Sequence, residues 1–242
     1  MEHLPANEVH VWCAHPEALA TETTYAAARA LITADEATRL ERFAFARDRR
    51  IFLATRALVR RVLSRYAPVA AHDWRFVITQ HGRPEISSEG DPSLRFNLSN
   101  THGLVVCAVV RHGEIGVDAE SVGRAGAHLE LAERYFAPTE VAALRTLPSP
   151  AQPRRFCEYW TLKESYLKAR GVGLGLPLDR FAFFFDPDHS PHFHVDPELD
   201  DQGDSWRFSL CRPTADHVVA LCVRPTPPGD VTVVLRWQEL GY

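Results

Sequence analysis

The chain has 242 residues, of which 45% are hydrophobic, so it is long and apolar enough to bury a full core. Its 27 Lys and Arg residues against 31 Asp and Glu residues give a net charge of -4, which excludes an overall basic field toward nucleic acid or an anionic membrane. No signal-peptide pattern opens the chain, no apolar run approaches the ~18 residues of a membrane helix, and the five scattered cysteines are typical of buried thiols in a reducing compartment. We therefore expect a globular, cytoplasmic protein with no nucleic-acid or membrane partner.

The first half of the chain combines strand patterns with one long helix pattern. A strand is predicted at 8–13, and a shorter helix begins at 33 and ends at 42. From Arg49 to Tyr66, apolar residues recur at helical spacing, and Pro68 ends the pattern. Further strands are predicted at 74–79, 94–98 and 104–111, with the segment 99–103 connecting the last two.

The second half begins with a strand at 114–120 and contains two helical stretches. The first, 128–147, is interrupted at Pro138, where a fresh helix start is expected. The second, 154–170, has aromatic anchors, and Gly171 is placed to end it. Strands are then predicted at 181–185, 192–195, 206–210, 217–223 and 231–237. This order indicates an α+β fold, divided into residues 1–115 and 116–242.

Two carboxylates occur at alternate positions of the strand Ile-Gly-Val-Asp-Ala-Glu. Because side chains of a strand alternate between its faces, Asp118 and Glu120 project to the same side. Adjacent carboxylates repel each other unless a hard divalent cation such as Mg²⁺ binds between them. A solvated strand end is the alternative interpretation, since Asp-x-Glu is a common sequence.

A second constellation lies in the helix Trp-Thr-Leu-Lys-Glu-Ser-Tyr-Leu-Lys. Glu164 and Lys168 stand four residues apart on one side of this helix, with Trp160 one turn earlier. Taken alone, this is an ordinary surface pair beside an aromatic anchor. Taken with Asp118 and Glu120, it offers a third carboxylate for a metal and an ammonium group for phosphate charge.

These two segments, about forty residues apart and in this order, resemble the signature of the Sfp-type 4'-phosphopantetheinyl transferase superfamily. That family has a Gly-[Ile/Val]-Asp-x-Glu strand followed by a Trp-x-x-Lys-Glu-x-x-x-Lys helix, and every specified position is matched here. Upstream, Gly82-Arg83-Pro84 resembles the Gly-Lys-Pro turn of the family, and Phe-Asn-Leu-Ser at 96–99 resembles its Phe-Asn-Ile-Ser run. The resemblance covers roughly residues 43–176, and four ordered motifs are hard to obtain by chance.

The resemblance implies a reaction: Mg²⁺-dependent transfer of the 4'-phosphopantetheine group from coenzyme A to a serine of an apo acyl or peptidyl carrier protein, releasing adenosine 3',5'-bisphosphate. Asp118, Glu120 and Glu164 would hold Mg²⁺, with Mn²⁺ as an alternative metal. Lys168 would bind phosphate and stabilise the leaving group, and Glu164 or a metal-bound water would take the serine proton. The residues implied in coenzyme A binding are Arg47, Arg83, Pro84, Ser99, Asn100, Thr101, Asp118 and Lys168.

One position departs from the family pattern. Many relatives have His after the Phe-Asn-x-Ser run, whereas this chain has Asn100. An amide can still donate a hydrogen bond to phosphate, but it cannot carry the positive charge that a His can carry there. We therefore expect an effect on coenzyme A affinity or on its pH dependence.

The family fold implies two similar halves related by pseudo-twofold symmetry, with the active site at the cleft between them, and a monomer as the functional unit. Because carrier proteins are acidic, the arginines along the long helix, Arg49, Arg56 and Arg60, are a candidate docking surface. Two other functions suit the same residues: a Mg²⁺-dependent nucleotide pyrophosphate hydrolase, and a catalytically silent module that binds coenzyme A or a carrier protein.

Overall fold

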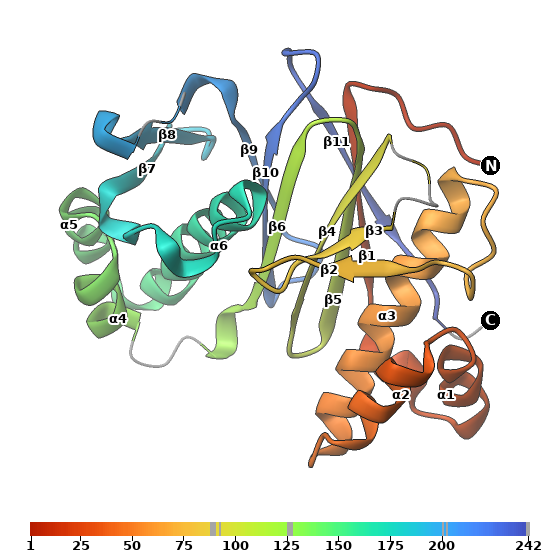
Figure 1. Ribbon diagram of the computed structural model, residues 1–242. Helices are drawn as coiled ribbons and strands as arrows, with labels where there is room; N and C mark the ends of the chain where they lie inside the picture. Colours follow the sequence, from red (N-terminus) through yellow and green to blue (C-terminus); the bar gives the residue numbers. More distant parts are fainter. Residues whose placement is uncertain (88–90, 92, 125–127, 200, 202, 241–242) are drawn as a thin grey trace. The chain divides into compact units, whose positions relative to one another are not determined.

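The chain divides into two compact units in the computed structural model, which describes residues 1–87, 91, 93–124, 128–199, 201 and 203–240. Unit 1 consists of Met1–His112 and Thr232–Tyr242, and unit 2 of Gly113–Val231. Both contain a sheet with a long helix packed against it (Figure 1). Among the described residues, no helix has both the length and the hydropathy needed to cross a bilayer.

Unit 1 is built on a four-stranded sheet of order β11-β1-β5-β4. Its strands are β1 (Glu8–Ala14), β4 (Leu94–Thr101), β5 (Leu104–Arg111) and β11 (Thr232–Trp237). Helix α3 (Ala46–Tyr66) packs against β5 and β4, and the shorter helices α1 (Glu22–Arg29) and α2 (Ala34–Glu41) contact α3. A small hairpin of β2 (Phe76–Ile78) and β3 (Pro84–Ile86) completes the unit.

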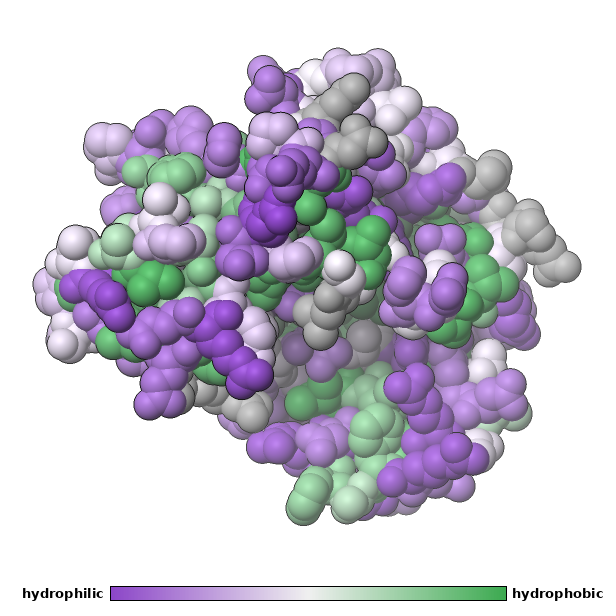
Figure 2. Space-filling view, turned by 60° about the vertical axis from the view of Figure 1, so that its left-hand side comes forward, coloured by the Kyte–Doolittle hydropathy of each residue, from purple (hydrophilic) through white to green (hydrophobic). Residues whose placement is uncertain are grey.

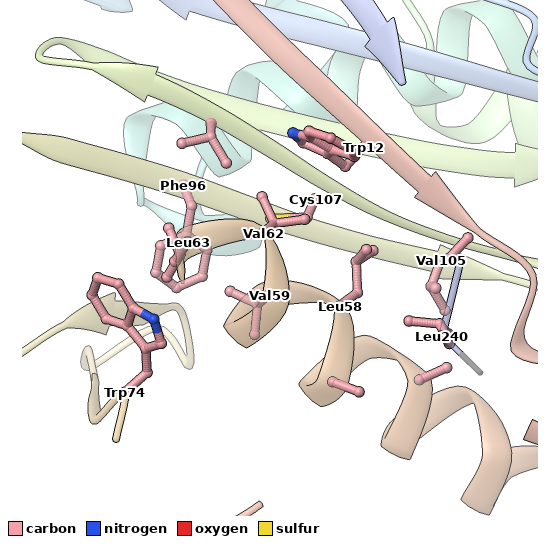
Figure 3. Close-up of a cluster of buried hydrophobic side chains, with 14 of the residues drawn as sticks. Trp12, Leu58, Val59, Val62, Leu63, Trp74, Phe96, Val105, Cys107 and Leu240 are labelled. Atoms are coloured by element: carbon pink, nitrogen blue, oxygen red, sulfur yellow. The ribbon is translucent and has the colours of Figure 1, made fainter. Parts of the chain in front are cut away.

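The helical spacing in α3 explains the core of unit 1. Leu58, Val59 and Val62 are fully buried and belong to one cluster with Trp12 and Cys107 of the sheet (Figure 3). Burying each large aliphatic side chain stabilises the fold by roughly 1.5–3 kcal/mol. The apolar face of α3 therefore fixes the helix on the sheet.

Unit 2 is built on the antiparallel sheet β6-β10-β9. Its strands are β6 (Glu114–Ser121), β9 (Arg207–Cys211) and β10 (His217–Arg224). Helix α6 (Gln152–Arg170) lies against β6 and β10 and ends at a left-handed glycine, Gly171, with φ of 66°. Helices α4 (His128–Tyr135) and α5 (Pro138–Thr146) and the hairpin of β7 (Phe181–Phe185) and β8 (Pro191–Val195) surround α6 (Figure 1).

The surface is largely hydrophilic on the face shown in Figure 2, with smaller apolar areas between the polar side chains. In unit 2 the exposed large apolar residues include Leu131, Tyr135 and Phe184, at 39%, 36% and 45% exposure. Polar side chains thus predominate on this face, as the net charge of -4 and the charged fraction of 24% lead one to expect.

The α+β fold expected from the sequence is confirmed, with differences in detail. Strand β4 extends to Thr101, so residues 99–101 are strand, and the connection to β5 is only His102 and Gly103. Helix α1 was not predicted. The sequence-based division between residues 115 and 116 assigned the last strand to the second half, whereas β11 pairs in parallel with β1 in unit 1. A pairing between segments more than two hundred residues apart leaves no local sequence pattern.

Candidate active site

The two carboxylates of strand β6 share the strand face that lies toward α6. Gly116, Asp118 and Glu120 alternate along β6 and so project to one side of the sheet. Ala220 of β10 is paired with Asp118, and Ala220 belongs to the same core cluster as Leu162 of α6. The acidic side of β6 is therefore the side that the helix covers.

Gly116 allows α6 to approach β6 closely. A Cβ atom at Gly116 would lie within 3.0 Å of main-chain atoms of Ser165 and Ala169, closer than real Cβ contacts come. Ser165 directly follows Glu164 in the helix, and Ala169 directly follows Lys168. The glycine of the Gly-x-Asp motif thus has a packing role, which the sequence motif alone did not reveal.

Lys168 is paired with the buried acid of β6. Its Nζ donates to Asp118 Oδ1 at 2.7 Å and to the main-chain oxygen of Val117 at 3.1 Å. The Asp118 side chain is 9% exposed and the Lys168 side chain 30% exposed. The helix therefore places a cation directly against the first residue of the acidic pair.

Glu164 lies one helical turn before Lys168. In the described part of the chain its side chain makes no hydrogen bond or ion pair of its own. Burial raises the pKa of the Glu164 carboxyl, and the negative charge of Asp118 raises it further; the Lys168 ammonium lowers this pKa, and the charge of Glu120 adds a smaller increase. Three carboxylates thus influence one another electrostatically at the contact between β6 and α6.

These side chains suit a hard divalent cation by their chemistry. Within the described ranges, no three His, Cys, Asp or Glu side chains already lie close enough together to form a metal-binding cluster. The three carboxylates nevertheless provide the all-oxygen ligands that Mg²⁺ prefers, and a divalent cation would relieve the repulsion that raises the pKa of Glu164. The donor set fits Mg²⁺, and the ammonium of Lys168 pairs with Asp118 at the same place.

The coenzyme A residues predicted in unit 1 lie on several elements. Arg47 is exposed near the start of α3, with its Nε 3.4 Å from Asp48. Arg83 is mostly buried and donates to the main-chain oxygen of Phe96 at 3.3 Å, and Pro84 opens β3. In β4, Ser99 and Thr101 are buried on one face, whereas Asn100 is exposed on the other. The three β4 residues therefore do not share one surface.

Two arginines of the expected docking surface are structural instead. Arg60 is 1% exposed and donates to Glu36 Oε2 at 2.6 Å, and its guanidinium lies over the ring of Phe76. Arg56 is 14% exposed and also pairs with Glu36. The prediction that Arg56 and Arg60 face a partner is wrong, because α2 brings an acidic residue over this flank of α3.

Sequence reasoning also missed a buried ion pair beside the site. Lys163, the residue before Glu164, lies 2.8 Å from Glu140 Oε2, and both side chains are 0% exposed. Lys163 was visible as a fixed position of the helix motif, but its partner 23 residues earlier was not. A Glu at the third position of a helix that begins with Pro138 was the available signal, since such residues accept main-chain hydrogen bonds at helix starts.

Two family models match this chain. The 4'-phosphopantetheinyl transferase superfamily model matches residues 114–222, which contain the whole carboxylate site. The model of the N-terminal part of 4'-phosphopantetheinyl transferases matches residues 19–112, within unit 1.

Full-length relatives extend this similarity. The chain is 35% identical to the 4'-phosphopantetheinyl transferase HetI of Nostoc sp., over 71% of this chain and 72% of the relative. It is 31% identical to the 4'-phosphopantetheinyl transferase Sfp of Bacillus subtilis, over 86% and 89%. It is 28% identical to the L-aminoadipate-semialdehyde dehydrogenase-phosphopantetheinyl transferase of Mus musculus, over 87% and 71%. With both units matched and the acidic strand and its helix inside the matched region, the chain belongs to the 4'-phosphopantetheinyl transferase superfamily.

Proposed function

We propose that Asp118, Glu120, Glu164 and Lys168 form the catalytic centre of this 4'-phosphopantetheinyl transferase. The protein moves the phosphopantetheine arm onto carrier proteins, and the observation that supports this centre is the pairing of the acidic face of β6 with Glu164 and Lys168 of α6. A nucleophile of its own is not required, because the carrier serine supplies the attacking oxygen.

The carboxylates would hold Mg²⁺, or Mn²⁺ as an alternative. When bound, the metal neutralises charge on the coenzyme A pyrophosphate and on the leaving group. Lys168 donates to a pyrophosphate oxygen and stabilises the charge that develops on adenosine 3',5'-bisphosphate. Asp118 is already the acid nearest to this ammonium, so the metal ligand and the phosphate-binding cation lie side by side.

Glu164 acts as the general base of the transfer. The serine Oγ forms a bond to the phosphorus that carries the pantetheine arm, the bond from this phosphorus to the bridging oxygen breaks, and the serine proton passes to Glu164. Its carboxylate makes no hydrogen bond to another side chain within the described residues, which leaves an oxygen to accept the serine proton. The nucleotide leaves as adenosine 3',5'-bisphosphate.

Residues of unit 1 contact the coenzyme A phosphates in this proposal. Arg47 has an exposed guanidinium at the start of α3, where the helix dipole also favours an anion, and it is assigned to the 3'-phosphate. Arg83 and Pro84 are assigned to a second phosphate contact, and Asn100 to the nucleotide, because it is the exposed member of the predicted β4 residues whereas Ser99 and Thr101 are buried. We further propose that the protein acts as a monomer and lies in the cytoplasm; its free cysteine thiols, four of them buried, support the location only.

Intact-mass spectrometry of apo carrier proteins tests this function. A panel of apo acyl and peptidyl carrier proteins is incubated with the protein, coenzyme A and Mg²⁺, in parallel with EDTA, with Glu164→Gln and with Glu130→Gln. Glu130 is the matched control, because it is an exposed acid of α4 in the same unit. We expect one phosphopantetheine on the carrier with the unsubstituted protein and with Glu130→Gln, and none with EDTA or Glu164→Gln.

The result that would contradict the proposed centre is full transfer by Glu164→Gln. Release of phosphopantetheine without a carrier would instead indicate a pyrophosphate hydrolase. Binding of coenzyme A without modification of any carrier would indicate a silent binding module.

A further inference from the structure

The buried pair of Lys163 and Glu140 lies on another side of α6 from the catalytic residues. Consecutive helical residues point about 100° apart, so Lys163 does not share the face of Glu164. Phe181 and Phe136 place their rings 4.5 and 5.5 Å from the ammonium, and both carboxylate and ammonium are fully buried. An ion pair in such surroundings is stable only when its geometry and its further hydrogen bonds are well satisfied.

The pair also provides hydrogen-bond partners for main-chain groups on the second edge of strand β7. Strands β7 and β8 form a two-stranded sheet, so among the described residues no strand pairs with the other edge of β7. Lys163 Nζ donates to the main-chain oxygens of Phe181 at 2.6 Å and Leu178 at 2.7 Å. Glu140 Oε1 accepts from the main-chain nitrogen of Phe183 at 2.9 Å. The two side chains thus supply the donor and acceptor that a neighbouring strand would supply.

Glu140 connects this point to the start of α5. Its Oε2 accepts from the main-chain nitrogen of Ala137 at 2.9 Å as well as pairing with Lys163. Helix α5, the turn at Leu178 and strand β7 are therefore all tied to one position on α6. Any rotation of α6 about its axis would break several buried hydrogen bonds at once and leave an unpaired charge.

We propose that Glu140 and Lys163 are positioning residues for the transfer reaction: they fix the rotation of α6 so that Glu164 and Lys168 face the acidic side of β6. Gly116 fixes the same helix from the β6 side by allowing close approach. The inference rests on the proposed roles of Glu164 and Lys168, whose side chains follow Lys163 within five residues.

Kinetics and metal binding of four variants test the positioning role. Glu140→Gln and Lys163→Met each break the pair, Glu140→Gln/Lys163→Gln replaces it by two neutral amides, and Leu144→Ala is the matched control. Leu144 is a fully buried residue of α5 in the same core cluster, so its truncation destabilises unit 2 without touching the pair. All variants are compared at a temperature where circular dichroism shows each of them folded.

The expected result separates positioning from stability. Because misplacing a catalytic group by about 1 Å costs on the order of a hundredfold in rate, we expect Glu140→Gln and Lys163→Met to lower kcat by about tenfold to a hundredfold. The KM for coenzyme A should change by less than about threefold, and Mn²⁺ affinity measured by electron paramagnetic resonance should weaken. The neutral double variant should recover at least about threefold in kcat over either single variant.

The proposal can be overturned in more than one way. A loss of kcat and Mn²⁺ affinity in Leu144→Ala equal to that in Glu140→Gln, at matched melting temperature, would overturn it. A double variant whose kcat is no higher than that of either single variant would also overturn it. Where a single variant fails to fold, folded and active protein in the double variant supports the coupling of Glu140 and Lys163. Glu164→Gln is measured in the same experiment. If Glu164→Gln keeps full activity, the proposed catalytic centre is wrong. If Glu164→Gln loses activity but Glu140→Gln loses no more than Leu144→Ala, only the positioning role is refuted.

Discussion

At the scale of single residues, the contacts of Lys168 bear directly on the proposed catalytic centre. Its ammonium is bound to Asp118 at 2.7 Å and to the Val117 carbonyl at 3.1 Å. A divalent cation held by Asp118 would compete with this ammonium for the same carboxylate. In the proposed centre, Lys168 and the metal would therefore compete for one carboxylate, while each would also bind the phosphates.

Removing the Lys168 charge should consequently separate metal binding from coenzyme A binding. For Lys168→Met we expect Mn²⁺ to bind at least as tightly as in the unsubstituted protein, because a competing cation is gone. The KM for coenzyme A should rise by about tenfold to a hundredfold, the range expected for the loss of a charged hydrogen bond of about 1.5–3 kcal/mol. Electron paramagnetic resonance and steady-state kinetics measure the two effects.

Arg170 provides the control for this prediction. It lies half a turn further along α6 and pairs with Asp201 at 3.1 Å, so Arg170→Met removes a cation of the same helix without touching Asp118. Arg170→Met should leave the Mn²⁺ affinity and the KM for coenzyme A close to those of the unsubstituted protein. If Lys168→Met weakened Mn²⁺ binding, competition between the ammonium and the metal would be ruled out.

Residues that repeat with the period of their own element could be predicted from the sequence. Asp118 and Glu120 follow the two-residue period of a strand, and Glu164 and Lys168 the four-residue spacing of a helix. Partners from other elements could not be predicted. The burial of Arg60 under Glu36 depends on how α2 packs on α3, which no local pattern records.

At the scale of elements, the site depends on the distance between β6 and α6. Replacing Gly116 with Ala would place a Cβ against the Ser165 carbonyl and the Ala169 main chain, so the helix must move outward. Overpacking of this kind costs about 1–3 kcal/mol. We expect Gly116→Ala to lower the free energy of unfolding by this amount in urea titrations and to lower kcat as well, because α6 carries Glu164.

Gly123 is the matched control for Gly116→Ala. It lies in the short turn after β6, and a Cβ there would meet no atom of the described residues within 4 Å. Gly123→Ala should leave both stability and kcat within the range of an ordinary surface substitution, about 0.5 kcal/mol. Equal effects of the two substitutions would mean that close approach of α6 does not determine the site.

Element boundaries followed the sequence where strong local signals exist. The predicted helix at 154–170 is observed as Gln152–Arg170, with Gly171 ending it, and the strand at 181–185 has the predicted bounds. The extension of β4 through Thr101 was missed, because Ser, Asn and Thr favour turns by composition. Pairing of Ser99 to Thr101 with Leu104 to Val106 of β5 outweighs that preference.

At the scale of the whole molecule, both units bury groups that ionise in alkali. Burial raises the pKa of Tyr66 in unit 1 to about 12 and that of Cys157 in unit 2 to about 12, and it raises the pKa of the thiols of Cys107 and Cys222 as well. The folded protein therefore keeps protons that the unfolded chain loses above about pH 9 for thiols and pH 10 for tyrosine. Stability contributed by these groups is fully present at neutral pH and is lost as the pH rises toward 12.

Tyr66 allows this linkage to be tested at one group. Its hydroxyl accepts from Trp12 Nε1 at 2.8 Å and lies 2.6 Å from His10 Nδ1, and the residue is 2% exposed. Each such group lowers the free energy of unfolding by about 1.4 kcal/mol per pH unit between its unfolded and folded pKa values. Tyr66→Phe should therefore be about 1 kcal/mol less stable at neutral pH, through the lost hydrogen bonds, yet lose stability less steeply above about pH 10.

Urea unfolding with a reducing agent at several pH values from neutral to about pH 11 measures how steeply the free energy of unfolding falls with pH in Tyr66→Phe and in the unsubstituted protein. Tyr25, a partly buried tyrosine of α1 packed against the same core cluster, provides Tyr25→Phe as the control, whose slope should match that of the unsubstituted protein. Parallel slopes for Tyr66→Phe and the unsubstituted protein would show that the Tyr66 hydroxyl ionises as readily in the folded core as in the unfolded chain. The alkaline loss would then come from the other groups whose pKa burial raises, which include the Cys157 thiol and the hydroxyls of Tyr159 and Tyr166.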